Sequence, residues 1–249
     1  MEVVSNYKFQ VLEKIGNGGF GFVEKIQLFN MSETHSGLYA RKVLEPKTEL
    51  KLYRERFKKE VMCQSQCHHK HIIPIYIASI NSEKPHFIMQ LGIHDLQELL
   101  DNDALEEAEK YAVMDALLLG LKHIHDQGFI HRDIKPSNII MCDDGTFKIT
   151  DFGLIRRTDI TKELNPLTAI GFVLGTEEYL APELHYEGND YSHKSDIFAM
   201  GKIFDKLNIT HEGLQKIIKK CCKMDPTDRY ESIDQILIDI ESLDGVSAA

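Results

Sequence analysis

The sequence contains no tryptophan, no internal repeat and no long apolar run. A helix that spans a bilayer needs about 20 consecutive apolar residues, and the longest candidate, Ala112 to Leu121, is shorter and contains Asp115. The start of the chain, Met1 to Asn6, has no basic segment followed by an apolar one, so it lacks the pattern of a signal peptide. We therefore expect a soluble, cytoplasmic protein without a membrane span.

The chain also lacks a disulfide framework. Its five cysteines are odd in number and irregularly spaced, which favours a reducing compartment. Cysteine and histidine are crowded in only one stretch, which holds Cys63, Cys67, His68, His69 and His71. All are possible zinc ligands, but their spacing fits no common structural zinc pattern. Zinc is therefore kept as an alternative to an ordinary helix end.

Basic residues are scarce in the second part of the chain. Up to Leu91 there are 13 basic and 9 acidic residues, whereas 16 basic and 30 acidic residues follow. This excess argues against nucleic acid and anionic membranes as partners. It suits a basic protein substrate, although a solvated acidic face is the more common reason for such a bias. The 249 residues, 43% of them hydrophobic, suffice for one large domain or two small ones.

A glycine-rich turn joins two expected strands near the start. Residues Tyr7 to Ile15 alternate between apolar and polar side chains, as a strand does. Gly16, Gly18 and Gly21 then match G-x-G-x-x-G, a spacing that dinucleotide-binding folds also use, with a helix opening at the last glycine. Here Val23 to Leu28 continues as a second strand. Such a hairpin can close over phosphates because no side chains intervene, and an ordinary glycine hairpin is the alternative.

The remaining periodicities predict a small, mostly antiparallel sheet with one helix, followed by a mostly helical part. The expected strands and helix of the first part are Leu38 to Leu44, Leu50 to Cys67 (the helix), Ile75 to Ile80 and His86 to Met89. The expected helices of the second part are Asp95 to Leu100, Leu105 to Asp126 with Gly128 ending it, the helix that begins in Ser192 to Gly201, Leu214 to Lys223 and the helix of Ile233 to Leu243.

Four residues near the middle of the chain suit one chemical task. Asp133, Lys135 and Asn138 lie in one octapeptide, and Asp151 opens an Asp-Phe-Gly sequence thirteen residues after Asn138. A short carboxylate such as Asp133 can orient a hydroxyl and accept its proton, and Lys135 can neutralise a phosphoryl group in transit. Asn138 and Asp151 supply hard oxygen ligands, which suit Mg²⁺. The set can hold metal-bound phosphate beside a hydroxyl.

These two motifs resemble the catalytic loop and the metal motif of protein kinases, and the resemblance extends from about Tyr7 to Leu243. It implies an α+β, two-lobed fold with a small antiparallel-sheet N-lobe carrying one helix and a larger, mostly helical C-lobe. The kinase domain would cover residues 7–244, with the N-lobe at 7–91 and the C-lobe at 92–244. The resemblance further implies ATP and Mg²⁺ as cofactors. A lysine two residues after Asp133 is typical of serine/threonine kinases.

The same resemblance assigns further residues. Lys42, in Ala40-x-Lys42, would hold the α- and β-phosphates, and Glu60 would pair with it, Glu55 being the alternative. The hydroxyl of Thr176 would bond to Asp133 and Lys135. The residues that would contact ATP are Ile15, Gly16, Asn17, Gly18, Gly19, Phe20, Gly21, Val23, Ala40, Lys42 and, at the hinge, Gln90 and Gly92.

The resemblance also implies an activation segment from Asp151 to Glu183. Any of its threonines Thr158, Thr161 and Thr168 could be phosphorylated. The cationic partners for such a phosphate would be Arg132, Arg156 and Arg157.

Two supporting contacts follow from the resemblance: Asp196 would brace the backbone of the catalytic loop, and Arg229 would pair with Glu183. Three places depart from the family pattern. Gln64 stands where an apolar residue is usual, Phe198 replaces a usual tryptophan, and the segment from Leu207 to Gly213 is much shorter than its counterpart.

We therefore predict a serine/threonine protein kinase that transfers the γ-phosphoryl group of ATP to protein hydroxyls and phosphorylates its own activation segment. A pseudokinase, which keeps the fold without the chemistry, is a second interpretation because of Gln64 and the shortened segment. A kinase of small molecules or lipids is a third, but Ala181-Pro182-Glu183 and Thr176 favour peptide substrates. The predicted partners are proteins with serine or threonine, and neither nucleic acid nor a particular oligomeric state is indicated.

Overall fold

A computed structural model describes residues 1–18, 21–45, 50–158, 177–186 and 190–243 of the chain. The chain divides into two compact units: the first contains Met1–His68 and Ile73–Ile93, and the second His69–Ile72 and His94–Ala249. The short segment His69–Ile72 belongs with the second unit because its backbone pairs there, with the Ile149 N–H donating to the His71 carbonyl at 2.9 Å. The division after Ile93 lies two residues beyond the boundary expected from the sequence.

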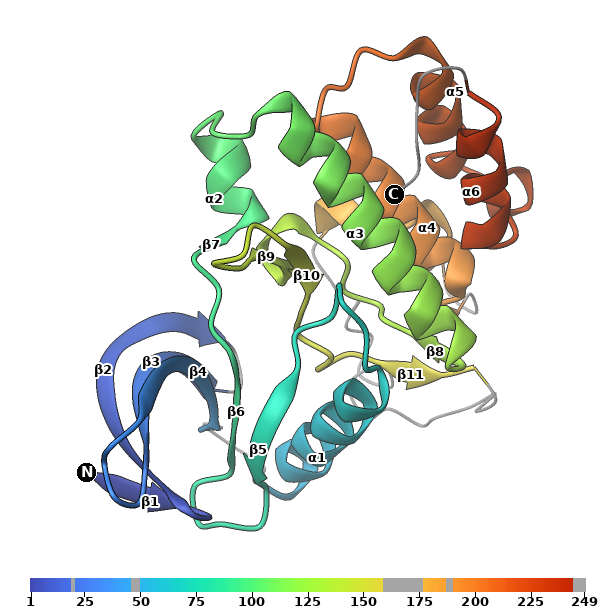
Figure 1. Ribbon diagram of the computed structural model, residues 1–249. Coiled ribbons are helices and arrows are strands. Elements are labelled where there is room, and N and C mark those ends of the chain that lie inside the picture. Colours follow the sequence, from blue (N-terminus) through green and yellow to red (C-terminus); the bar gives the residue numbers. More distant parts are fainter. Residues whose placement is uncertain (19–20, 46–49, 159–176, 187–189, 244–249) are drawn as a thin grey trace. The chain divides into compact units, whose positions relative to one another are not determined.

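The first unit is built on one antiparallel sheet with the strand order β1-β2-β3-β4-β6-β5 (Figure 1). The strands are β1 (Glu2–Val4), β2 (Tyr7–Gly18), β3 (Gly21–Asn30), β4 (Ser36–Leu44), β5 (Ile75–Ser79) and β6 (His86–Gln90). The sequence predicted each of them except β1, which pairs with the start of β2, Glu2 lying opposite Phe9. A three-residue strand is too short to show a period.

Both faces of this sheet bury apolar side chains. On one face Phe9, Ile26, Leu28 and Ile88 form a cluster that Val4 of β1 completes. On the other face the single helix α1 (Leu50–Gln66) packs its Phe57 and Val61 against Leu44 and Phe87. Phe57 and Val61 are four residues apart and so lie on the same side of the helix. That spacing is what turns one side of α1 toward the sheet.

The second unit is mostly helical and is organised around α3 (Glu107–Asp126) and α4 (His193–Lys206) (Figure 1). Both helices bury residues on most of their circumference, as central helices do. The other helices are α2 (Leu96–Asp101), α5 (Glu212–Cys221) and α6 (Ile233–Glu241). None of the helices in the described ranges combines the length and the apolar composition that a membrane span requires. The predicted α+β organisation, a sheet with one helix and then a larger helical part, is confirmed.

Short strands and 3₁₀ turns hold the loops of the second unit. The strands β7 (His94–Asp95), β9 (Ile139–Met141) and β10 (Phe147–Ile149) form one small sheet, and β8 (Phe129–Ile130) pairs with β11 (Arg156–Arg157). The 3₁₀ turns are η1 (Pro136–Asn138), η2 (Glu177–Tyr179), η3 (Pro182–His185) and η4 (Pro226–Asp228). Strands β8 and β9 flank the loop of Asp133, so the two ends of that loop are held by backbone pairing.

The shortened segment after Leu207 brings α5 directly onto α4. Only residues 207–211 separate the two helices. A Cβ atom added at Gly201 of α4 would lie 2.6 Å from the Cβ of Cys221 and 2.9 Å from the sulfur of Cys222. The close approach therefore requires glycine at this position.

Candidate active site

The residues expected to handle phosphate fall into two groups, one in each unit, and each group is described by itself. In the first unit the Nζ atom of Lys42 on β4 lies 2.5 Å from Oε1 of Glu60 on α1. The side chain of Glu60 is only 5% exposed and that of Lys42 is 23% exposed. A buried carboxylate of this kind holds the ammonium group in one place because it has no competing solvent.

Glu55, the alternative partner, is directed elsewhere. It lies 3.5 Å from Lys58 on the same helix, and its side chain is 66% exposed. Glu60 comes immediately before Val61 and three residues after Phe57, so it belongs to the side of α1 that faces the sheet. The helix period thus decides between the two glutamates in favour of Glu60.

Three residues expected to contact ATP lie on one face of the sheet. Ala40 and Lys42 are two residues apart on β4 and therefore point the same way, and Val23 of β3 lies directly opposite Lys42. Met89 of β6 lies opposite Ala40 on the same face. Ala40 is buried, with only 3% of its surface exposed.

The glycines of the β2–β3 hairpin serve two different purposes. A Cβ added at Gly21 would lie 1.9 Å from the carbonyl oxygen of Val43, so this glycine is required by the approach of β4. At Gly16 and Gly18 the nearest atoms to an added Cβ lie at 3.6 and 3.8 Å, which is ordinary contact. The described fold therefore does not itself demand glycine there, whereas close approach of a phosphate would. The predicted contact residues Gly19 and Phe20 lie outside the described residues.

The residues expected to form the hinge lie at the end of the first unit. Gln90 is the last residue of β6, opposite Tyr39, and its N–H donates to the carbonyl of Pro74 at 3.2 Å. This bond uses the Gln90 donor within the unit, so a purine could bond only to its carbonyl. Gly92 follows β6, and Ile15 on β2 is 47% exposed.

Gln64 is buried within the first unit, although it is polar. Its Nε2 donates to the carbonyl of Ile73 at 2.8 Å, and its Oε1 has no hydrogen-bond partner among the described residues. Gln64 therefore ties the end of α1 to the segment that leads into β5. The departure from an apolar residue at this position has a structural reason within the unit, which the sequence did not reveal.

In the second unit Asp133, Lys135 and Asn138 form one cluster. Lys135 Nζ lies 2.9 Å from Oδ2 of Asp133. The Nδ2 atom of Asn138 donates to the same carboxylate oxygen at 3.0 Å and to the Asp133 backbone carbonyl at 2.8 Å. Both contacts fix the rotamer of Asp133, so its carboxylate is oriented before any substrate binds.

Asp196 braces the backbone of this loop, as predicted. Its Oδ2 accepts from the His131 N–H at 2.8 Å and its Oδ1 from the Arg132 N–H at 2.9 Å. Arg132 has a φ of +73°, a strained conformation for arginine that the two bonds help to maintain. Burial alone would raise the pKa of Asp196, but the hydrogen bond from His125 and the charge of His125 outweigh it and lower that pKa. Asp196 is therefore ionised when it holds the loop.

The Asp-Phe-Gly sequence is tied to the catalytic loop through its neighbours. The Thr150 N–H donates to the Asn138 carbonyl at 2.9 Å, and His131 packs edge-on against the ring of Phe152, with centroids 5.1 Å apart. Asp151 has a φ of +61°, and its Oδ1 accepts from the Gly153 N–H at 3.2 Å. Complete burial lowers the pKa of His131, so this ring is neutral and acts as a structural support.

The donor set fits Mg²⁺. Asn138 and Asp151 offer a carboxamide and a carboxylate, and hard oxygen donors suit this ion, which also binds phosphates. The Nδ2 atom of Asn138 donates to Asp133. The carboxamide oxygen is therefore the atom of this group that would bind a metal ion. Across the described ranges no group of three or more His, Cys, Asp or Glu side chains is arranged to hold a metal. The zinc alternative at Cys63 to His71 therefore finds no support.

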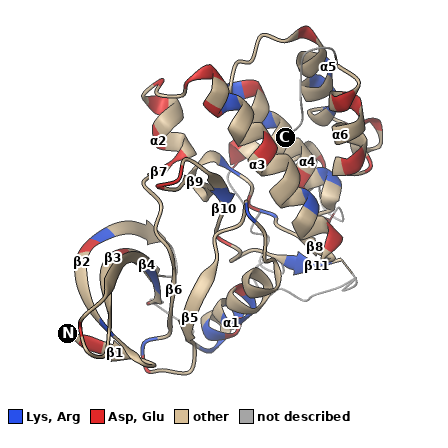
Figure 2. Cartoon of the chain, in the orientation of Figure 1, with Lys and Arg blue, Asp and Glu red and all other residues tan. Residues whose placement is uncertain are grey.

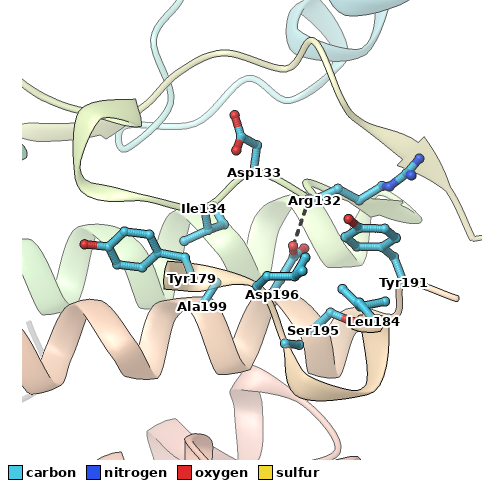
Figure 3. Close-up of a pocket in the computed structure, with 11 residues that line it drawn as sticks. Arg132, Asp133, Ile134, Tyr179, Leu184, Tyr191, Ser195, Asp196 and Ala199 are labelled. Atoms are coloured by element: carbon cyan, nitrogen blue, oxygen red, sulfur yellow. Dashed lines mark hydrogen bonds between the residues drawn. The ribbon is translucent and has the colours of Figure 1, made fainter. Parts of the chain in front are cut away.

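A pocket lies beside Asp133, between the loop, α4 and the segment that contains η2 and η3 (Figure 3). Its lining is largely apolar, and the side chains include Ile134, Leu180, Leu184 and Tyr191. In Figure 3 the carboxylate of Asp133 points away from Asp196. No sequence pattern indicated this pocket, because its walls come from three separate segments.

Part of the expected activation segment can be placed. Thr158 is exposed, and both its N–H and its hydroxyl donate to the Gly128 carbonyl, at 2.9 and 3.2 Å. Arg132 lies over the ring of Tyr191, 4.3 Å from its centre, and Arg156 pairs with Asp190. The remaining threonines of the prediction, Thr161, Thr168 and Thr176, lie outside the described residues.

A buried ion pair lies at the end of the expected activation segment, as predicted. Arg229 donates to both carboxylate oxygens of Glu183, at 2.9 and 2.7 Å. The arginine side chain is fully buried and also donates to the carbonyls of Lys194, Lys223 and Met224. One side chain thus links η3, α4 and the end of α5.

The charges of the two units differ in sign, and Figure 2 shows Lys and Arg gathered on α1. Acidic residues are concentrated at the C-terminal end of α2 and the start of α3, where Glu98, Asp101, Asp103, Glu106 and Glu107 are exposed. Among these, Glu107 pairs with Lys110 at 3.2 Å and Glu98 with His94 at 3.0 Å. These five acidic side chains therefore belong to a solvated surface.

Comparison with known proteins gives a consistent result. Residues 9–215 match the model of the protein kinase domain. The chain is 30% identical over 204 residues to human cyclin-dependent kinase 11A, covering 80% of this chain and 25% of that protein. It is 31% identical over 210 residues to the serine/threonine-protein kinase pkn3 of Myxococcus xanthus, with 81% and 37% covered.

A third relative is the serine/threonine-protein kinase PknL of Mycobacterium tuberculosis, 30% identical over 158 residues, with 63% of this chain and 38% of that protein covered. The chain therefore spans between a quarter and two fifths of the length of these three relatives.

Proposed function

The chain belongs to the protein kinase domain family, and from that premise we propose that it is an ATP-dependent serine/threonine kinase. The cluster of Asp133, Lys135 and Asn138 carries the proposal, because its contacts orient a carboxylate and place a cation beside it. Phosphoryl transfer asks little more of a protein than positioning and charge neutralisation. A preformed cluster of this kind supplies both.

Each residue has a role in the proposed reaction. Asp133 orients the attacking hydroxyl and accepts its proton. Lys135 and Lys42 neutralise the negative charge of the phosphates, Lys42 being held by Glu60. Gly16 and Gly18 let the backbone approach the phosphates, since no Cβ stands in the way.

Magnesium and the adenine have proposed contacts as well. Asn138 and Asp151 would hold Mg²⁺ through oxygen atoms, and the ion when bound would neutralise phosphate charge. The Gln90 carbonyl and the backbone of Gly92 would bind the adenine, with Val23 and Ala40 packing on the ring.

Protein substrates follow from the family, and serine or threonine as the acceptor from Lys135. The apolar pocket beside Asp133 would take an apolar side chain of the substrate next to the acceptor residue. Thr176 would bond to Asp133, and Thr158, Thr161 or Thr168 would be sites of autophosphorylation. A cytoplasmic location and the absence of nucleic acid from the partners remain parts of this proposal.

Transfer from radiolabelled ATP with Mg²⁺ tests the activity. The acceptors are the protein itself, a generic basic protein and a peptide array. We expect Asp133→Asn to abolish incorporation. Asp144→Asn is the matched control, because Asp144 lies in the exposed turn between β9 and β10, where it accepts from the Thr146 N–H at 3.0 Å. If none of the three acceptors receives phosphate in an Asp133-dependent way, the proposal is wrong.

The same experiment separates a kinase from a binding module. A pseudokinase would bind ATP, shown by a thermal shift, yet transfer no phosphate from it. The burial of Gln64 and its bond to Ile73 remove one motive for that interpretation, because they give the residue a structural role within its unit.

A further inference from the structure

Two histidine rings stack where α3 ends and α4 begins. His125 lies in the last turn of α3, and His193 is the first residue of α4. Their rings are nearly parallel, with an interplanar angle of 13° and centroids 4.1 Å apart. His125 donates from Nε2 to Oδ2 of Asp196 at 2.9 Å. The side chains of His125 and Asp196 are each less than one tenth exposed.

One ring of the stack, that of His125, therefore contacts the carboxylate that braces the catalytic loop. Asp196 accepts from the His125 ring with the same oxygen that receives the His131 N–H, and its other oxygen receives the Arg132 N–H. Asp133 follows Arg132 directly. Displacement of the His125 ring would leave the buried carboxylate with one donor fewer.

The surroundings of His193 favour its neutral form. Its Nε2 is buried and has no hydrogen-bond partner among the described residues. Burial and then the neighbouring His125 lower the pKa of His193, whereas Asp196, the Phe129 carbonyl and Asp126 act in the opposite direction. A positive charge at the first residue of a helix is also unfavourable because the helix dipole is positive there.

We propose that His193 is a positioning residue for phosphoryl transfer: its ring holds His125 in place as a donor to Asp196, and Asp196 in turn holds the backbone beside Asp133. The catalytic consequence rests on the proposed function, whereas the brace itself does not. A proton added to His193 puts a positive charge into the stack at the start of α4, and the nearby acid Asp126 already pairs with Lys122. A positive charge is unfavourable at this end of a helix, so the stack, and with it the brace, weakens as the pH falls.

Amide exchange tests the brace without relying on catalysis. The exchange rates of the His131 and Arg132 amides are measured in the wild type, His193→Ala and His193→Phe. The alanine variant removes the stack, and we expect it to speed exchange at both amides about tenfold. The phenylalanine variant keeps an aromatic ring and restores rates to within about threefold of the wild type. Equal rates in all three proteins overturn the proposal.

A second histidine stack in the same unit provides the matched control. His123 stacks on His69, with centroids 5.0 Å apart and an angle of 18°, and neither ring is bonded to Asp196 by any described contact. His123→Phe removes a titratable ring of the same kind from α3. We expect the His131 and Arg132 amides to exchange at wild-type rates in this variant. Faster exchange there would mean that any change in α3 loosens the loop, which contradicts a specific role for His193.

Kinetics tests the catalytic consequence. We expect His193→Ala to lower kcat about tenfold while KM for ATP changes less than about twofold. Between pH 7.5 and 5.5 the wild type loses kcat, and His193→Phe, whose ring takes no proton, loses less. Identical pH profiles for these two proteins contradict the proposal. If the wild type transfers no phosphate at all, the proposed function fails, and the amide rates still decide whether the brace exists.

Discussion

At the scale of single residues, Lys42 shows how one charge depends on its partner. Its ammonium group is held by the buried Glu60 at 2.5 Å. Loss of the Glu60 charge frees Lys42 to move away from the phosphates. We expect Glu60→Gln to lower kcat/KM for ATP about a hundredfold, a magnitude typical of a lost electrostatic contact in a transition state.

The matched control for this prediction is Glu55→Gln on the same helix, because the Glu55 side chain is 66% exposed and pairs with the partly exposed Lys58. We expect its kinetics to stay within about twofold of the wild type. Steady-state assays at varied ATP compare the three proteins. A Glu60→Gln enzyme as active as the control would show that Lys42 needs no partner.

Gln64 illustrates a polar residue whose burial depends on one hydrogen bond. Gln64→Leu would remove the donor to the Ile73 carbonyl and leave that acceptor unpaired, at a cost of about 1–3 kcal/mol. Urea unfolding measures the change in free energy of unfolding. Gln66→Leu, at the exposed end of the same helix, is the control and should change it by less than about 0.5 kcal/mol. A more stable Gln64→Leu protein would mean that an apolar residue suits this site better.

At the scale of elements, the contact between α4 and α5 depends on one glycine. Gly201→Ala would place a methyl group 2.6 Å from the Cβ of Cys221, so the helices must separate or the backbone must shift. Overpacking of this kind costs about 1–3 kcal/mol, although the helix propensity of alanine recovers part of it.

Gly16→Ala on β2 is the control for Gly201→Ala, since an added Cβ there meets nothing closer than 3.6 Å. Thermal unfolding of the two variants should therefore separate them, with only Gly201→Ala lowering Tm. If Gly201→Ala is as stable as the wild type, the two helices are not held at this distance in solution.

Arg229 links three elements, and its loss should therefore be costly. Arg229→Met would leave Glu183 buried without its cation and three backbone carbonyls without their donor. Breaking a buried pair from one side costs about 3–5 kcal/mol. The exposed pair of Lys216 and Glu212 on α5 offers the contrast, and Lys216→Met should cost less than about 0.5 kcal/mol in the same urea titration. Equal costs would mean that Arg229 is not the link.

At the scale of the whole molecule, several histidines make stability depend on pH. Burial lowers the pKa of His69, His71, His86, His131 and His193 below the ordinary value of 6.5. The unfolded chain therefore binds more protons than the folded one below about pH 6.5. The stabilisation is complete above that pH and is lost as the pH falls toward the folded pKa values. Burial raises the pKa of Asp115, which acts in the opposite direction, but it is one group against five.

We accordingly expect the free energy of unfolding to decrease between pH 7.5 and 5.5, with a slope of up to about 1.4 kcal/mol per pH unit for each histidine that stays neutral in the fold. Urea titrations across this range measure it. A free energy that is constant or rises on acidification contradicts the assignment of neutral rings.

Much of the fold was predictable because its signals are local. The alternation in β2, the helical spacing in α1 and α3 and the spacing of Asp133, Asn138 and Asp151 are each contained in a short stretch of chain. Strand β1 was not predicted, because three residues are too few to show a period. The pocket beside Asp133 was not predicted either, because the residues that line it come from segments that are distant in sequence.

The sequence by itself determined which chemical groups this protein can offer, since residue type and local spacing suffice to recognise a phosphate loop, a carboxylate and its oxygen ligands. Only the tertiary structure decided which groups act on one another. It selected Glu60 over Glu55, paired Gln64 with Ile73, and brought His125 to Asp196 and His193, although 71 residues separate His125 from Asp196. Such partners meet because packing closes long loops, and no pattern along the chain records which side chains will then touch.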